Sequence, residues 1–178
     1  MNFKVSAEHA LLGILMTGPQ YGYELHRYIS IHMSQFWDLS MSQVYALLKR
    51  MEHDTMVVSQ EKRQKTRPPK KIFTLTPQGK DTFLQWLVTP VDHVRDMRIE
   101  FMAKLFFIKK LCQKECPAFL DSQIAVLEEK VQGIERSKET SADEFQAILY
   151  SFKASQATAA LEWLRRCKAS LLPHNKQE

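Results

Sequence analysis

Two short segments of strand-forming residues interrupt a chain whose pattern is otherwise helical, and the stretch between them is strongly basic. The segments MVVSQ (56–60) and IFTLT (72–76) are rich in β-branched and aromatic side chains, which favour strands. The ten residues KRQKTRPPKK (62–71) carry six positive charges, two prolines and no acid. The pattern predicts a β-hairpin with a cationic tip that proline restrains in conformation.

Amphipathic helices are expected on both sides of this hairpin. Ser6 can cap the first helix, and Thr76-Pro77 suits the start of the last one, with threonine at the N-cap and proline at the first helical position. Three helices, a hairpin and a closing helix predict a winged helix-turn-helix domain over residues 1–89. The expected helices lie at 6–17, 21–33, 40–53 and 77–88.

The helix 40–53 has a polar face with no evident structural task. Ser40 and Gln43 match a capping box at its start. Such a face suits the major groove of DNA, which admits one helix and offers donors and acceptors on the base edges. Residues 40–71 hold eight lysines and arginines against three acids, so the positive charge is concentrated here and predicts a polyanionic partner. The apolar face is expected to consist of Met41, Val44, Leu47, Leu48 and Met51.

Long helices are expected in the C-terminal half, at about 96–111, 118–137 and 142–172. The middle one carries apolar residues spaced 4, 3, 4, 3, as in the seam of a coiled coil. The apolar stripes exceed what these helices can cover among themselves, which predicts a homodimer. The alternative reading of the aromatic and methionine-rich stripe is a cavity that senses a planar small-molecule effector.

The predicted fold is therefore mainly α with a small β-hairpin. It comprises an N-terminal winged helix-turn-helix domain at 1–89 and a C-terminal helical, coiled-coil-like dimerisation domain at 90–178. The residues expected to form the dimer contact are Leu120, Ile124, Leu127, Val131, Ile134, Phe145, Phe152 and Trp163.

Three ordered motifs resemble the PadR family of bacterial transcriptional regulators: YGYEL (21–25), SQVYALLKRMEHD (42–54) and RPPKKIFTLTPQGK (67–80). RDMRIEFMAKLFF (95–107), followed by two helices, is similar to the larger subfamily that includes AphA-like virulence activators. The resemblance implies a homodimer that binds a near-palindromic operator, with repression as the usual outcome and activation in the AphA-like branch. It also implies that Tyr21 and Tyr23 lie near the phosphates.

In this resemblance the helix 40–53 is the recognition helix and 62–71 is the wing. The chain departs from the family in the wing turn, where Thr66 and Pro69 replace the usual glycine and arginine. The residues expected to contact double-stranded DNA are Tyr21, Tyr23, Ser40, Ser42, Gln43, Tyr45, Lys49, Arg50, Arg63, Lys65, Arg67 and Lys70.

Enzymes, metal sites and membrane spans lack their usual signals in this sequence. Five glycines leave no phosphate-cradling loop, and the histidines and cysteines show no metal-ligand spacing, so no catalytic residue, metal or cofactor is expected. The three cysteines, Cys112, Cys116 and Cys167, are expected to be reduced packing thiols. Since there is neither a run of about 18 apolar residues nor a convincing signal peptide, a cytoplasmic protein is predicted.

A second hypothesis uses the same fold for a different task. A winged-helix adaptor would contact other proteins through its N-terminal domain and dimerise through its C-terminal helices. Salt-dependent binding to duplex DNA distinguishes a DNA-binding regulator from such an adaptor, because phosphate contacts release counterions.

Overall fold

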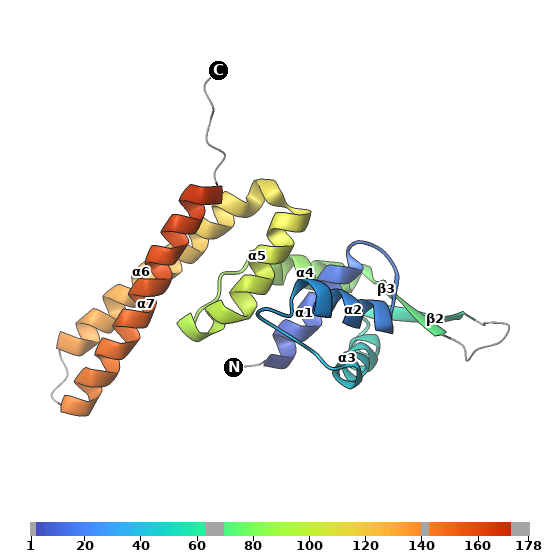
Figure 1. The fold of residues 1–178 in the computed structure, drawn as a ribbon, viewed down its shortest axis with the longest axis horizontal. Helices are drawn as coiled ribbons and strands as arrows, with labels where there is room; N and C mark the ends of the chain where they lie inside the picture. Colours follow the sequence, from blue (N-terminus) through green and yellow to red (C-terminus); the bar gives the residue numbers. More distant parts are fainter. Residues whose placement is uncertain (1–2, 63–69, 140–142, 172–178) are drawn as a thin grey trace, which may run out of the picture. The chain divides into compact units, whose positions relative to one another are not determined.

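The computed structural model describes residues 3–62, 70–139 and 143–171, with side chains from residue 7 onward (Figure 1). The chain forms two compact units. The first consists of residues 1–89 with 102–107, and the second of 90–101 with 108–178. Residues 102–107, which follow the predicted boundary at residue 89, thus belong to the first unit. A single boundary near residue 89 does not describe this division. The division into a DNA-binding domain at 1–89 and a dimerisation domain at 90–178 stays a prediction.

The first unit contains four helices and three short strands in its described part. The helix α1 begins at Phe3, so the predicted cap at Ser6 is wrong, whereas Thr76 does cap α4 by accepting a hydrogen bond from the Gly79 amide at 3.0 Å. The elements are α1 (Phe3–Leu15), β1 (Gln20–Tyr21), α2 (Gly22–His32), α3 (Met41–His53), β2 (Val57–Lys62), β3 (Lys70–Leu75) and α4 (Pro77–Val88).

The predicted hairpin is present and is part of a three-stranded antiparallel sheet with the order β1-β3-β2. The added strand β1 pairs Gln20 with Phe73 and Tyr21 with Ile72. Two residues are too few to show an alternating pattern, which is why the sequence did not reveal this strand. The arrangement of helices, sheet and closing helix confirms the predicted mainly α fold with a winged helix-turn-helix (Figure 1).

The core of the first unit forms where α1, α4 and the middle of α5 (Glu100–Leu111) meet. The ring of Phe83 packs edge-on against Phe107, with the ring centroids 5.5 Å apart. Gly13 makes room for both rings, since a Cβ at this position would lie 2.7 Å from each of them. Close packing of this kind makes the core sensitive to the addition of even one methyl group.

A lysine is buried in the same region. Lys104 on α5 is almost fully buried, and its Nζ donates a hydrogen bond to the Thr89 carbonyl at 2.6 Å. The ammonium also lies 5.0 Å from the ring centroid of Trp86, within cation–π range. Because Thr89 is the C-cap of α4, this positive charge also interacts favourably with the negative end of the α4 dipole.

The second unit is built around a helical hairpin. Helices α6 (Cys116–Glu139) and α7 (Glu144–Leu171) lie side by side along their lengths (Figure 1). Arg165 on α7 pairs with Glu128 on α6, with 2.6 Å between nitrogen and oxygen, and Lys168 pairs with Asp121. The short helices η1 (Val94–Arg98) and η2 (Gln113–Glu115) complete the unit.

The predicted coiled-coil seam on α6 is used within the chain. Leu120 and Leu127 are 1% and 0% exposed in a single copy, so their assignment to a dimer contact is wrong. Trp163 is half-buried and packs edge-on against Phe101, with 5.9 Å between the ring centroids, inside the same unit. An antiparallel hairpin partner covers a heptad stripe as well as a second chain does, and the sequence spacing alone does not distinguish the two cases.

The remaining seam residues, Ile124, Val131 and Ile134, are half-buried on α6. In contrast, Phe145 and Phe152 near the start of α7 are 71% and 59% exposed. The apolar surface left open in the described part of α7 therefore lies at its N-terminal end.

Gln123 anchors the segment that opens the second unit. Its side chain is 0% exposed and makes two hydrogen bonds with one residue: the Val91 amide donates to Oε1 at 2.8 Å, and Nε2 donates to the Val91 carbonyl at 3.0 Å. A buried glutamine satisfied in this way holds the backbone after Pro90 in one conformation.

Replacing Gln123 with methionine, which has a similar volume, is expected to lower the free energy of unfolding by about 2–4 kcal/mol, because the Val91 N–H and C=O would be buried without partners. Urea denaturation measures the change. The matched control is Gln132→Met on the exposed face of α6, which should leave the free energy of unfolding nearly unchanged. Equal stabilities of the two variants would show that the Gln123 hydrogen bonds contribute nothing net.

Candidate nucleic-acid interface

The helix α3 begins with the predicted capping box. The Gln43 amide donates to Ser40 Oγ at 3.3 Å, and the Ser40 amide donates to Gln43 Oε1 at 2.8 Å. Ser40 Oγ also lies 3.0 Å from Ser42 Oγ. The side chain of Gln43 is thus turned back to the helix start, and its assignment to base contact stays a prediction that requires this capping bond to open.

The helix α3 is buried on one face only. Val44, Leu47, Leu48 and Met51 are buried as predicted, while Met41 is exposed and does not belong to the core. The opposite face presents side chains that can donate or accept hydrogen bonds. The exposed residues on this face are Ser42, Gln43, Tyr45, Ala46 and Lys49.

Arg50 does not share this exposed face. Its guanidinium forms an ion pair with the carboxylate of Glu8 on α1, and Glu8 is buried. A carboxylate in such a position needs a cationic partner, because an isolated buried charge is strongly destabilising. The structure therefore places Arg50 in the contact between α3 and α1, where it positions α3.

The ring of Tyr45 lies over the start of α2. A Cβ added to Gly22 would be 2.7 Å from Cε1 and Cζ of Tyr45. The lack of a side chain at Gly22 thus allows the exposed phenol ring to rest on the backbone, with its hydroxyl also close to Gly22, which restricts the orientation of the ring.

Two tyrosines and a lysine form a cluster beside the sheet. The rings of Tyr21 and Tyr23 stack with centroids 5.8 Å apart, and Lys70 Nζ lies 5.8 Å and 4.8 Å from these two centroids. Lys70 belongs to β3, whereas the tyrosines come from β1 and the first turn of α2. The β1–β3 pairing therefore brings together three residues that the sequence separates.

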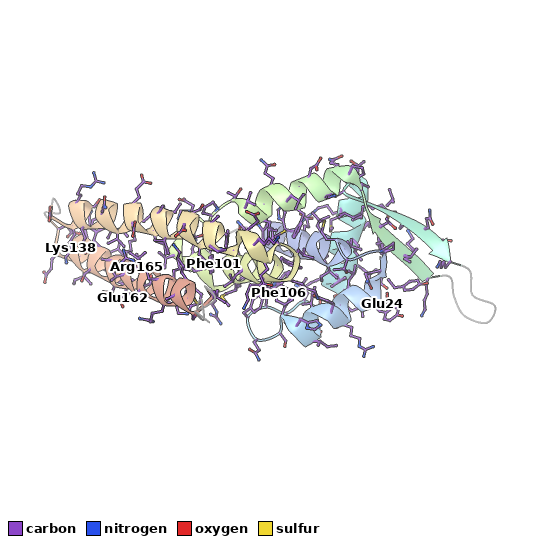
Figure 2. The ribbon with its side chains drawn as sticks, turned by 90° about the horizontal axis from the view of Figure 1, so that it is seen from above. Glu24, Phe101, Phe106, Lys138, Glu162 and Arg165 are labelled. Carbon is purple, nitrogen blue, oxygen red and sulfur yellow. The ribbon has the colours of Figure 1, made fainter. Side chains whose placement is uncertain are left out.

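Glu24 organises this cluster (Figure 2). Its Oε2 accepts a hydrogen bond from the Tyr21 amide at 2.9 Å, and its Oε1 accepts one from the Tyr23 hydroxyl at 3.1 Å. The hydrogen bond to the carboxylate raises the pKa of Tyr23 above its ordinary value, so the phenol stays protonated. Glu24 thereby caps α2 and orients the Tyr23 ring at the same time.

The hairpin places like charges opposite each other towards its tip. Lys62 on β2 is the cross-strand neighbour of Lys70 on β3, whereas the preceding pair, Glu61 and Lys71, has opposite charges. Lys71 Nζ also lies 3.9 Å from Glu52 Oε2 on α3. Two facing lysines repel each other and destabilise the pair unless an anion lies between or beside them. The predicted contacts Arg63, Lys65 and Arg67 lie outside the described residues.

Some of the predicted site residues therefore lie close together on the surface, whereas others, such as Gln43 and Arg50, make contacts within the protein. Ser42, Tyr45 and Lys49 share an exposed surface, and Tyr21, Tyr23 and Lys70 form one cluster. Sequence reasoning missed three supporting residues: Glu8, Gly22 and Glu24. The glutamate three residues after Tyr21 was a readable signal, since this spacing is typical of a capping carboxylate.

Metal ligation has no support among the residues that the structure describes. No group of three or more histidine, cysteine or acidic side chains is arranged to hold an ion there. Across the same part of the chain, none of the helices is both long and apolar enough to span a bilayer.

Two cavities of about 700 and 740 Å³ lie in the second unit. The first is lined by polar and charged groups such as Lys130, Tyr150 and Lys153. The second is lined by apolar residues that include Leu120, by two cysteines, and by charged residues such as Lys168. Either volume is large enough for a small molecule. The predicted planar effector nevertheless stays a prediction, because no feature of these cavities selects a planar ligand.

Comparisons with known proteins match both halves of the chain. Residues 11–85 match the transcriptional regulator PadR-like family, and residues 97–171 match the family described as virulence activator alpha C-term. The negative transcriptional regulator PadR of Bacillus subtilis is 30% identical over 132 residues, which cover 74% of this chain and 72% of that protein.

Solved structures of the same Bacillus subtilis protein are also similar. Its complex with operator DNA has a TM-score of 0.48 at 25% identity and covers 93% of this chain and 98% of that one. Its complex with p-coumaric acid has a TM-score of 0.42 at 23% identity, with coverage of 96% and 98%.

Replacing Glu8 with alanine is expected to lower the free energy of unfolding by about 1–3 kcal/mol, because the partly buried Arg50 guanidinium would lose the carboxylate that pairs with it. Thermal unfolding followed by circular dichroism measures the loss. Asp81→Ala on the exposed surface of α4 is the control and should leave the melting temperature nearly unchanged. If the Glu8→Ala protein has the same melting temperature as the wild type, the ion pair does not stabilise the position of α3.

Proposed function

The chain belongs to the PadR-like family of transcriptional regulators, and we propose that it acts as a homodimer that binds a near-palindromic operator in double-stranded DNA. The observation that carries this proposal is the exposed polar face of α3 beside a sheet whose outer residues are cationic, both within one unit. Helix α3 is the recognition helix, and the hairpin of β2 and β3 is the wing.

The base contacts are assigned to the exposed side chains of α3. Ser42 and Lys49 can hydrogen-bond to base edges in the major groove, and Tyr45 can do so with its hydroxyl. Arg50 acts differently, since its pairing with Glu8 positions the helix. This assignment divides the residues predicted from the sequence into those that contact base edges and those that position the recognition helix.

The phosphate contacts are assigned to the lysines of the sheet and the tyrosines beside them. Lys62 and Lys70 face each other across the hairpin, so a phosphate placed near them would relieve their repulsion as well as attract them. Tyr23 keeps its proton and can donate it to a phosphate oxygen when it exchanges Glu24 Oε1 for this partner. Arg63, Lys65 and Arg67, which lie outside the described residues, are proposed as further phosphate contacts from the sequence alone.

Dimerisation is assigned to the open apolar stripe of α7. The residues Phe145, Ile148, Leu149 and Phe152 are all exposed and recur at i, i+3, i+4 and i+7, so they share one face of the helix. A second copy of the chain is the proposed occupant, because a near-palindromic operator requires two recognition helices about 34–36 Å apart. Ile124, Val131 and Ile134, half-buried on α6, would lie at the edge of this contact.

We further infer that the protein acts by binding rather than by catalysis and works in the cytoplasm, where its DNA target is found. Repression is the proposed outcome, because the Bacillus subtilis relative named as a negative regulator matches across both halves of the chain. The match of residues 97–171 to a virulence activator family supports activation as the alternative. A reporter gene under the operator, compared with and without the protein, distinguishes the two.

Substituting Lys49 and Lys70 singly with alanine is expected to weaken binding to duplex DNA severalfold, because each lysine neutralises a phosphate or contacts a base edge. Each change at a phosphate contact should also lower the slope of log K against log salt by about one. Gel shifts over a range of salt concentrations measure both quantities.

The control for these variants is Lys80→Ala, which removes an exposed lysine from the first turn of α4. It should bind DNA as the wild type does. If Lys49→Ala and Lys70→Ala keep both the affinity and the salt slope, the interface is misplaced. If the wild type itself shows no salt-dependent binding, the adaptor hypothesis is favoured.

The double substitution Phe145→Ser and Phe152→Ser is expected to convert the dimer to monomers, since it removes the two most exposed rings of the stripe. Sedimentation velocity measures the change in mass. Gln146→Ser, on the same turn of α7 and also exposed, is the matched control and should leave the dimer intact. Persistence of the dimer in the double variant would place the contact elsewhere.

A further inference from the structure

One carboxylate lies among the groups that are proposed to bind DNA phosphates. Glu24, in the first turn of α2, accepts hydrogen bonds from the Tyr21 amide and the Tyr23 hydroxyl (Figure 2). Lys70 lies over the rings of both tyrosines. An acid at this place repels the phosphates that the lysine attracts. Its position in the cluster therefore needs a specific reason.

Helix capping accounts for only one of the two carboxylate oxygens. Oε2 of Glu24 accepts the hydrogen bond from the Tyr21 amide at 2.9 Å, at the end of α2 where the helix dipole favours a negative charge. An amide oxygen can make the same bond, because glutamine also serves at the third position of a capping box. The cap thus does not require the charge of Glu24.

The other oxygen occupies a hydrogen-bond donor that DNA would use. Oε1 of Glu24 lies 3.1 Å from the Tyr23 hydroxyl, and Tyr23 is 40% exposed, so water could satisfy this hydroxyl equally well. A phenol has a single proton and cannot donate it to Glu24 and to a phosphate at the same time. The carboxylate and a DNA phosphate therefore compete for one donor.

The surroundings of Tyr23 suit either anion. Lys70 Nζ lies 4.8 Å from the centroid of the Tyr23 ring. The exposed Arg27, one turn further along α2, lowers the pKa of Tyr23, whereas Glu24 raises it. Two cations from different elements and the start of a helix thus lie near one hydroxyl. Phosphates and carboxylates are attracted by the same groups.

We propose that Glu24 takes the place of a DNA phosphate in the free protein and that the Tyr23 hydroxyl exchanges the carboxylate for a phosphate oxygen when DNA binds. This inference rests on the proposed function and adds to it the contact that DNA must break. Glu24 is a positioning residue, because it keeps the two tyrosines ordered in the absence of DNA.

The exchange has a consequence for affinity. Tyr23 makes one hydrogen bond before binding and one after it, so its contact with the phosphate adds little net free energy. The displaced carboxylate stays near the phosphate and repels it. Phosphate contacts are alike at every sequence, so Glu24 lowers the affinity for all duplexes and leaves discrimination to the base contacts of α3.

Replacing Glu24 with glutamine tests the exchange. The amide oxygen keeps the cap, the charge is lost, and the amide nitrogen can donate to the Tyr23 oxygen, which leaves the phenol proton free. The full-length variant should bind duplex DNA about threefold to tenfold more tightly than the wild type in fluorescence anisotropy at fixed salt. Asp81→Asn removes the same charge from the exposed surface of α4 and should leave the affinity nearly unchanged.

A double variant separates the hydrogen-bond exchange from a simple effect of charge. In a Tyr23→Phe protein, Glu24→Gln should raise the affinity less than it does in the wild type, because there is no hydroxyl to release. Equal gains in the two backgrounds would overturn the proposal. If the wild type binds DNA and Glu24→Gln binds it equally or more weakly, this inference fails and the proposed function stands. A wild type that binds no DNA overturns both.

A measurement without DNA tests the first half of the exchange. Titration of tyrosine ionisation by ultraviolet absorbance should show one group that ionises at lower pH in Glu24→Gln than in the wild type. The reason is that the variant loses the hydrogen bond and the charge that raise the pKa of Tyr23. Tyr23→Phe identifies the group by its loss. Identical titrations of the wild type and Glu24→Gln would show that the carboxylate does not hold the hydroxyl, and the proposal would be wrong.

Discussion

The proposed interface depends on one constraint, namely that α3 is buried on a single face and cannot rotate about its axis. Apolar contacts alone would allow some rotation, because they are not directional. The ion pair between Arg50 and the buried Glu8 adds direction, since a buried carboxylate can be satisfied only where the guanidinium reaches it. The side chains of Ser42, Tyr45 and Lys49 are exposed together for this reason.

The pairing of the strands determines where the positive charges of the first unit lie. Pairing of β1 with β3 brings Lys70 over the rings of Tyr21 and Tyr23, and pairing of β2 with β3 sets Lys62 opposite Lys70. The positive charges are thus held close together by backbone hydrogen bonds. Because the hairpin holds Lys62 and Lys70 opposite each other, the two charges repel, and a bound anion would reduce this repulsion.

Elements with a strong local signal could be predicted from the sequence. The capping box of α3, the threonine cap and proline at the start of α4, and the two longer strands all follow from short patterns. The strand β1 could not be predicted, since its existence depends on a partner fifty residues away. Glu8 and Arg50 each look like ordinary surface residues in the sequence, and only the packing of α1 against α3 shows that they meet.

The seam on α6 shows a second limit of prediction from sequence. The apolar spacing of the helix was predicted correctly, but the molecule that covers it was not. Leu120 and Leu127 face the seam as predicted, and the same chain provides the covering helix. Heptad spacing reports that a helix is covered along a stripe; it does not identify the molecule that covers it. Exposure in the folded chain then shows which apolar residues, Phe145 and Phe152 among them, still lack cover.

The buried lysine of α5 has a consequence for how the first unit can open. Lys104 holds the carbonyl of Thr89, the last residue before the chain passes into the second unit. Separating the two would break this hydrogen bond and remove the ammonium from the negative end of the α4 dipole. The end of α4 therefore cannot fray without also losing its contact with α5.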